Sequence, residues 1–246
     1  MDYDDYCDQF EAEGARFVAS AHAADVAAPV PGCPQWCVAD LLAHVGFVHR
    51  WARYLVAARA SERVSARDMN LSRGPVTSSW LAQGVHEALA TLRESDPNDV
   101  MWAWGADQHV RFWARRLLHE TLVHRVDLEE AMGVTSQIDA HIAIDAIDEF
   151  LANLERAGVF SPDVKNLVGT GEVITFRVDE GPSWQVLLTP GGFELLQESR
   201  HADAIISGSA RNVLLTLYRR APAGSSCEVS GRVEVIEKWL ENCALQ

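Results

Sequence analysis

Hydrophobic residues recur at helical spacing over roughly the first 155 residues, interrupted by clusters of proline, glycine and small polar residues. The pattern predicts helices over residues 2–24, 38–55, 77–95, 108–132 and 137–157. The prolines between Pro29 and Pro34 break the chain after the first helix, and a polar loop around Gly74 follows the second. Gly133 and Gly158 stand where the last two helices should end. Four long helices with short links predict a four-helix bundle.

Beyond about residue 165 the period of the hydrophobic pattern changes from helical to alternating. Short strands are predicted over residues 173–178, 184–188, 193–196 and 204–208, divided by glycine and proline turns. Helices are predicted over residues 210–220 and 232–242. The expected fold class is therefore α+β, with a helical bundle over residues 1–160 and a small α+β domain over residues 161–246.

Two of the predicted helices carry ionisable residues on their apolar stripes. Alternating steps of four and three residues select His44 in the second helix, and they select Glu120 and His124 in the fourth. An unpaired carboxylate on a buried stripe costs several kcal/mol, so it has to be neutralised, paired or given a cation. Glu120 and His124 share a helix face and can chelate one ion, while His44 reaches it from a facing helix. Two imidazoles and one carboxylate suit zinc with an open fourth position, as in catalytic sites.

Each of these residues also has a purely structural interpretation. His44 taken alone is typical of a core histidine whose hydrogen bonds are satisfied. Glu120 can be neutralised by Arg116, which precedes it by one helical turn. Three stripe positions together favour the metal over these alternatives.

Asp127 follows His124 by three residues and also lies on the stripe. Its carboxylate could accept a hydrogen bond from the second ring nitrogen of His124 and so orient the ring, or it could anchor Arg125. It could equally form an ordinary pair with Arg125 or another surface base. Aromatic residues nearby either wall a pocket or belong to the core: Trp102, Trp104 and Trp113.

Charge and composition narrow the class of partner. The 246 residues carry 35 acidic and 21 basic side chains, and a net charge of -14 opposes binding to nucleic acid or an anionic membrane. No apolar run approaches the roughly 18 to 20 residues of a membrane span, and no export signal is visible, so we expect a cytoplasmic protein. Five cysteines, an odd number, favour reduced thiols over a disulfide framework.

Four segments resemble the mycothiol-dependent maleylpyruvate isomerase family, whose first half is a DinB-like metal-binding bundle and whose second is sterol-carrier-like. They are Trp-Cys-Val-Ala-Asp-Leu-Leu-Ala-His at 36–44, His-Glu-Thr-Leu-Val-His-Arg-Val-Asp at 119–127, and the segments 202–210 and 215–220. The resemblance implies that zinc binds His44, Glu120 and His124. It also implies that Arg220, from the second domain, meets the substrate, and that mycothiol is the thiol cosubstrate.

The chain departs from this family pattern at two positions. Cys37 stands where such proteins usually have serine or threonine to cap the second helix, which we expect to begin at Val38 with Asp40 at its third position. Arg219 stands where glycine is common. The second departure leaves open whether Arg219 or Arg220 meets the substrate.

The leading hypothesis from the sequence is a zinc enzyme that uses a low-molecular-weight thiol. Such a thiol can isomerise a cis enedioate like maleylpyruvate by addition and elimination, or be transferred to a small electrophile. One alternative is a hydrolase in which metal-activated water attacks in place of the thiol. Another is a metal-bearing protein that binds a small ligand without catalysis. The expected partners are a small thiol and a small electrophile, with neither nucleic acid nor membrane.

Overall fold

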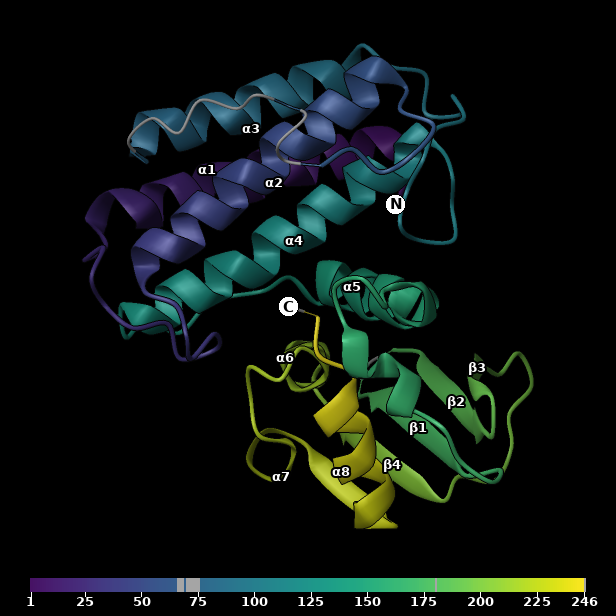
Figure 1. The fold of residues 1–246 in the computed structure, drawn as a ribbon. Helices are drawn as coiled ribbons and strands as arrows, with labels where there is room; N and C mark the ends of the chain where they lie inside the picture. Colours follow the sequence, from purple (N-terminus) through teal and green to yellow (C-terminus); the bar gives the residue numbers. More distant parts are fainter. Residues whose placement is uncertain (66–68, 70–75, 180, 246) are drawn as a thin grey trace. The chain divides into compact units, whose positions relative to one another are not determined.

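The computed structural model describes residues 1–65, 69, 76–179 and 181–245. The polar loop predicted around Gly74 lies outside the described residues. The chain divides into two compact units, Met1–Ser136 and Gln137–Gln246 (Figure 1). Helix α5 (Ala140–Asn153) falls in the second unit, whereas the sequence placed residues up to 160 in the first domain. It groups there because it packs against α6 (Ala210–Leu217).

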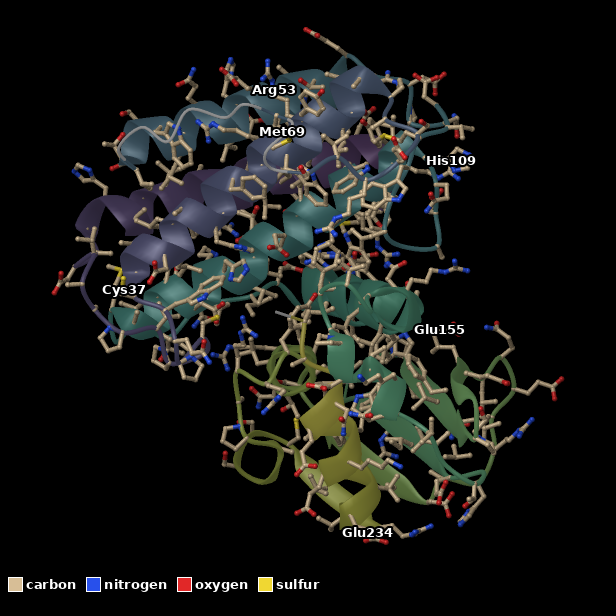
Figure 2. The ribbon with its side chains drawn as sticks, in the orientation of Figure 1. Cys37, Arg53, Met69, His109, Glu155 and Glu234 are labelled. Carbon is tan, nitrogen blue, oxygen red and sulfur yellow. The ribbon has the colours of Figure 1, made fainter. Side chains whose placement is uncertain are left out.

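The described part of the first unit forms a bundle of four long helices, as predicted. They are α1 (Tyr3–Ala23), α2 (Val38–Ala58), α3 (Ser78–Arg93) and α4 (Val110–Ala131). Helices α1 and α2 each pack against both α3 and α4. Figure 2 labels Cys37, directly before α2, and His109, directly before α4, at opposite ends of this bundle. Helices α2 and α4 therefore run antiparallel, which sets the first part of α2 opposite the last part of α4.

The ends of α2 and α4 follow the local chemistry of the sequence. At the start of α2 the Asp40 carboxylate accepts hydrogen bonds from the Cys37 backbone N–H at 3.0 Å and from its thiol at 3.1 Å. The helix begins at Val38, as predicted. Helix α4 is followed by Gly133 with φ of 72°, in the left-handed region that glycine adopts without steric cost.

Close packing of α2 against α3 depends on Gly46, two residues after His44. A Cβ at Gly46 would lie 1.9 Å from the Trp80 ring, so any larger residue would push the two helices apart. The Arg50 guanidinium lies 3.7 Å from the centre of the Trp80 ring and donates to the Trp80 carbonyl at 2.7 Å. These contacts hold one side of α2 against α3, and the other side of α2 faces α4.

The described part of the second unit is built on a five-stranded mixed sheet in the order β3-β2-β1-β4-β5. Its strands are β1 (Val173–Val178), β2 (Ser183–Thr189), β3 (Gly192–Leu195), β4 (Ala204–Gly208) and β5 (Glu228–Gly231). The central pair β1–β4 is parallel and the other pairs are antiparallel. Strands β1 to β4 and the α+β class confirm the prediction. Strand β5 was missed because Glu-Val-Ser-Gly contains a single apolar residue and shows no alternation.

Helices complete the second unit. Besides α5 and α6 they are α7 (Ala223–Ser226), α8 (Val233–Asn242) and the 3-10 turns η1 (Leu154–Arg156) and η2 (Pro162–Asn166). Trp239 of α8 is fully buried, with its ring centre 5.4 Å from that of Phe176 on β1 and 5.0 Å from that of Phe193 on β3. Among the described residues, no helix is both long and apolar enough to cross a membrane.

Helix α6 ends at Leu217, earlier than the predicted residue 220. The reason is Arg219, whose φ of 59° takes the chain into the left-handed region. The Arg219 N–H donates to the Thr216 carbonyl at 3.0 Å, and the Arg220 N–H donates to the Leu215 carbonyl at 2.7 Å. This pair of bonds is the Schellman ending, whose left-handed position is usually glycine. The family preference for glycine at Arg219 therefore has a backbone cause.

Candidate metal centre

Helices α2 and α4 bring together the three side chains expected to hold a metal. One ligand atom from each of His44, Glu120 and His124 lies within 4.8 Å of the other two. Oε1 of Glu120 is 2.9 Å from Nε2 of His44 and 3.3 Å from Nε2 of His124. The antiparallel helices supply one ligand from α2 and two, one turn apart, from α4. The geometry agrees with the predicted set, while its use in binding an ion stays a prediction.

The cluster is open on one side. The side chains of His44 and Glu120 retain 29% and 21% of their exposure, whereas that of His124 retains 9%. Most core residues on these helices are almost fully buried. An ion or a small molecule can therefore approach from the side of His44 and Glu120.

Asp127 contacts the second ring nitrogen of His124. Its Oδ2 atom lies 2.8 Å from Nδ1 of His124, and the carboxylate is fully buried. Arg125 is held elsewhere, by Glu13 and Glu129 on α1 and α4. Asp127 therefore contacts His124, which is one of the two interpretations that the sequence left open. A proton on Nδ1, directed at Asp127, leaves the Nε2 lone pair facing Glu120 and His44.

Glu120 also forms the ion pair with Arg116 that the sequence offered as an alternative to a metal. Nη2 of Arg116 donates to Oε2 of Glu120 at 3.2 Å. The two carboxylate oxygens are thus divided, Oε1 facing the histidines and Oε2 facing the arginine. The ion pair with Arg116 and a metal at Oε1 are compatible.

The charges within the cluster shift the pKa values of Glu120 and His124. Burial alone would raise the pKa of Glu120, but His124, His44 and Arg116 outweigh it and hold the pKa well below the usual range. Burial would lower the pKa of His124, but the Glu120 carboxylate and the hydrogen bond to Asp127 raise it to about 9. Both shifts arise because the cluster places opposite charges in a poorly solvated environment.

Two neighbours of the site were not identified from the sequence. The Trp36 ring centre lies 4.9 Å from that of His44 and 6.1 Å from that of His124. The Cys33 thiol donates to the Asp127 carboxylate at 3.8 Å. Both belong to the proline-rich segment between α1 and α2, and no periodic pattern in that segment could have shown which way it folds. The presence of Trp36 in the motif that ends at His44 was the only available signal.

A third histidine and two of the candidate aromatic residues make contacts outside the ligand set. Nε2 of His49 is hydrogen-bonded to Oγ1 of Thr121 at 2.9 Å, and complete burial lowers the pKa of His49 to about 3. Trp113 is fully buried and packs edge-on against Trp51 with ring centres 5.3 Å apart. Trp104 is half-buried and faces the Arg116 guanidinium, with Cζ 5.9 Å from the ring centre.

Comparison with known families supports the arrangement of the first unit. Residues 7–129 match the family model described as "Mycothiol maleylpyruvate isomerase N-terminal domain", which covers half of the chain. The chain belongs to this family. No curated protein sequence matches the chain.

Solved structures agree with this family at the level of the fold. "Crystal structure of the mycothiol-dependent maleylpyruvate isomerase" aligns with 94% of this chain and 93% of its own, with a TM-score of 0.62 and 15% identity. A histidine-to-alanine mutant of that isomerase aligns over the same shares, with a TM-score of 0.59 and 14% identity. A "UbiJ-SCP2 Ubiquinone synthesis protein" covers 37% of this chain and 82% of its own with 19% identity, and its TM-score of 0.27 carries no argument.

The donor set of this mycothiol maleylpyruvate isomerase family member suits a divalent metal. Two imidazole nitrogens and one carboxylate oxygen lie close enough together to share one ion, and the facing side is accessible. Zinc in catalytic sites takes three protein ligands of this kind and keeps a position open. The residues therefore fit a catalytic metal better than a closed structural one.

The arginines expected near the substrate lie in the second unit, just after α6. Arg219 is exposed. Arg220 is half-buried, and its Nη1 donates to the Tyr218 carbonyl at 2.7 Å. That bond fixes the Arg220 side chain against its own turn. A contact between Arg220 and the substrate stays a prediction.

Proposed function

We propose that this chain is a zinc-dependent enzyme that uses a low-molecular-weight thiol such as mycothiol. Its reaction is cis-trans isomerisation of a maleylpyruvate-like substrate or transfer of the thiol to a small electrophile. The observation that carries the proposal is the convergence of His44, Glu120 and His124 on the accessible side of the α2–α4 pair. Membership of a family named for mycothiol and maleylpyruvate supports the choice of cosubstrate.

The three proposed ligands and Asp127 have different roles at the metal site. Nε2 of His44, Oε1 of Glu120 and Nε2 of His124 would hold the metal. Zinc held there would lower the pKa of a small thiol and keep its sulfur ionised near neutral pH. Asp127 keeps the His124 ring in the orientation that presents Nε2.

Substrate recognition would involve residues around these ligands. The Trp36 ring packs beside both histidines and would shield one side of them from water. Arg220 would pair with a substrate carboxylate, because a guanidinium donates two parallel hydrogen bonds that match the two carboxylate oxygens.

The proposed isomerisation needs no net change in the thiol. Its sulfur adds to one carbon of the cis double bond, the other carbon takes a proton, and the carbon–carbon bond becomes single and rotates. Loss of the same proton and cleavage of the carbon–sulfur bond then return the trans isomer and the thiol. If the electrophile carries a leaving group, attack by the same sulfur displaces it and the thiol is transferred.

The experiment that tests this proposal combines metal analysis with a thiol-dependent assay. Purified wild type, His44→Ala and Glu120→Gln would be analysed for zinc and assayed for maleylpyruvate isomerisation with and without mycothiol. We expect about one zinc per chain in the wild type, loss in both variants, and turnover only with thiol. His86→Ala is the matched control, because His86 is exposed on α3.

The alternatives have different outcomes in the same experiment. Metal-dependent turnover without thiol would indicate the hydrolase. A wild type that takes up no zinc on titration would overturn the proposed mechanism and leave a protein that binds a small ligand. A bound ligand retained after chelation would support that role.

A further inference from the structure

We propose that Arg116 is a positioning residue that holds one oxygen of Glu120, so that only the other oxygen faces the metal. This inference rests on the proposed function, since it presupposes an ion between His44, Glu120 and His124. It assigns a role to a buried cation that the sequence offered only as an alternative to the metal. Arg116 would hold one carboxylate oxygen and leave the other for the ion.

The contacts of Glu120 divide cleanly between its two oxygens. Oε1 lies 2.9 Å from Nε2 of His44 and 3.3 Å from Nε2 of His124. Oε2 lies 3.2 Å from Nη2 of Arg116. A carboxylate side chain can rotate about its last bond and present both oxygens to one ion unless one of them is held. Arg116 supplies that hold from one turn earlier on the same helix.

Arg116 is itself restrained. Its side chain is only 4% exposed, and its guanidinium lies near the Trp104 ring. Trp104 belongs to the segment between α3 and α4. An arginine packed in this way loses less freedom on holding Glu120 than an exposed one would.

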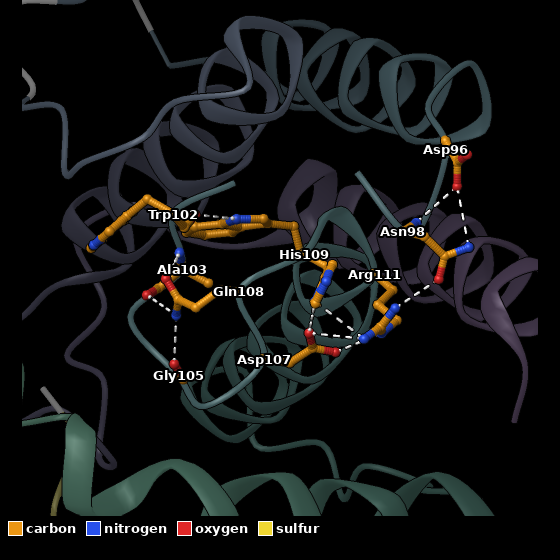
Figure 3. A network of polar contacts seen from close by, with 10 residues as sticks. Asp96, Asn98, Trp102, Ala103, Gly105, Asp107, Gln108, His109 and Arg111 are labelled. Atoms are coloured by element: carbon orange, nitrogen blue, oxygen red, sulfur yellow. Dashed lines mark hydrogen bonds and ion pairs between the residues drawn. The ribbon is translucent and has the colours of Figure 1, made fainter. Parts of the chain in front are cut away.

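The segment that carries Trp104 is held at several points (Figure 3). The Gln108 side-chain amide donates to the carbonyls of Ala103 at 2.7 Å and Gly105 at 2.8 Å. Asp107 accepts from Nε of Arg111 at 2.7 Å, and Arg111 donates to the Asn98 side chain at 2.8 Å. Ala103 and Gly105 flank Trp104, so the backbone that carries this ring is held beside Arg116.

The chemical consequence concerns the number of metal ligands. A carboxylate can bind zinc through one oxygen or through both, and a second oxygen would occupy the position that a small thiol needs. With Oε2 held by Arg116, Glu120 offers Oε1 alone. The guanidinium charge opposes a nearby cation, but that charge is already paired with Glu120. We therefore expect orientation to dominate the effect on affinity.

The test measures metal affinity and coordination in the whole protein. Zinc affinity would be determined by competition with a chelator for wild type, Arg116→Met and Arg116→Lys. Losing a group that orients a metal ligand typically costs about 10- to 100-fold in affinity, and we expect this for Arg116→Met. Arg116→Lys keeps one donor and the charge, and should recover most of the loss. Arg53→Met removes an exposed arginine of α2 and should leave affinity unchanged.

Cobalt provides a second readout that does not depend on activity. Four-coordinate cobalt absorbs visible light several times more strongly than five-coordinate cobalt. Arg116→Met should weaken the visible bands of the cobalt-loaded protein, because Glu120 becomes free to bind through both oxygens. Arg116→Lys should restore the wild-type intensity.

The outcomes separate this inference from the proposed function. If wild type binds no metal, the proposed function fails and this inference fails with it. If wild type binds zinc and Arg116→Met has the same affinity and cobalt spectrum, only the role of Arg116 is overturned. Should Arg116→Met fail to fold, Trp104→Leu removes the surface beside Arg116, and a fewfold loss of zinc affinity is expected. Unchanged affinity in Trp104→Leu would then overturn the inference.

Discussion

Helix α4 carries two buried polar clusters at neighbouring positions, one closed by its own charges and the other open to a cation. In the first, Nε of Arg125 lies 2.6 Å from Oε2 of Glu13 on α1, and Nη1 lies 2.7 Å from Oε2 of Glu129. Glu13 also pairs with Arg16. Two carboxylates and two guanidinium groups balance, and Arg125 and Glu13 are almost fully buried. We call this the arginine cluster.

The second, the histidine cluster, consists of His44, Glu120 and His124. It directs two imidazoles at one carboxylate oxygen, and its neighbours are Asp127 and Arg116. Its His44 and Glu120 side chains are more exposed than those of Arg125 and Glu13. His124 and Arg125 are consecutive residues, but they point to different faces of α4. His124 therefore belongs to the histidine cluster and Arg125 to the arginine cluster. A buried carboxylate is a metal-site candidate where one of its oxygens faces imidazoles, which can lose a proton and bind a metal, whereas guanidinium groups cannot.

The largest effect should come from breaking the arginine cluster. Arg125→Met would leave Glu13 buried without its main partner, and removing one partner of a buried pair costs about 3 to 5 kcal/mol. Urea unfolding with a metal chelator present would measure the loss. The double variant with Glu13→Gln should recover part of it. Arg93→Met, which removes exposed ion pairs, should cost far less, and an equal cost would contradict the distinction.

The histidine cluster should respond to metal where the arginine cluster does not. Zinc at about 100 times its dissociation constant should stabilise the wild type by about 2.7 kcal/mol, since it binds the folded state. Glu120→Gln should lose this gain, because its side-chain amide donates as well as accepts and carries no charge. Arg125→Met should keep the gain. Unfolding with and without zinc would measure it, and an equal gain in Glu120→Gln would argue against the site.

His49 offers a third case, a buried polar group of α2 that is neither charged nor open to solvent. Burial lowers its pKa from 6.5 to about 3, so it stays neutral in the folded protein while the unfolded chain takes up a proton below about pH 6.5. Stability should therefore be fully present above pH 6.5 and fall as pH drops toward 3. The contribution of His49 to the slope is at most about 1.4 kcal/mol per pH unit.

His49→Gln would isolate this contribution. The amide can still donate to Thr121 but cannot take up a proton, so stability should fall less steeply between pH 6.5 and 5 than in the wild type. His86→Gln on the surface should keep the wild-type slope. Parallel slopes for all three proteins would show that His49 does not govern the acid sensitivity.

The sequence predicted the histidine cluster because the positions of His44, Glu120 and His124 are periodic. Helical spacing fixes which residues share a face, and a buried carboxylate demands a partner. The same logic treated Arg116 and a metal as alternatives for Glu120 and favoured the metal, because spacing does not show that two oxygens can serve two partners. Trp36 was missed for a related reason. Its place at the site depends on the fold of an irregular segment.

In the second unit, strands β1 to β4 could be predicted because hydrophobic alternation is strong there. Strand β5 has no such pattern and forms because β4 offers it an edge to pair with. The end of α6 could not be found from hydrophobicity either. It depends on the backbone angle of Arg219, which the sequence indicated only through a family preference for glycine.

The smallest effect extends the comparison to two arginines whose backbone lies in the left-handed region. Arg59 and Arg219 are the two non-glycine residues with positive φ among those that the structure describes, at 47° and 59°. Nε of Arg59 pairs with Asp99 at 2.7 Å, whereas no hydrogen bond of the Arg219 side chain is found within the described part.

Replacement by glycine removes a left-handed strain of about 1 to 2 kcal/mol, but it also increases the conformational freedom of the unfolded chain. We expect Arg219→Gly to stabilise the protein by about 0.5 to 1 kcal/mol. Arg59→Gly should gain nothing, because it also loses the ion pair with Asp99, and urea midpoints would compare the two. A gain as large for Arg59→Gly would mean that backbone strain alone, and not the partners of the side chain, decides what such an arginine contributes.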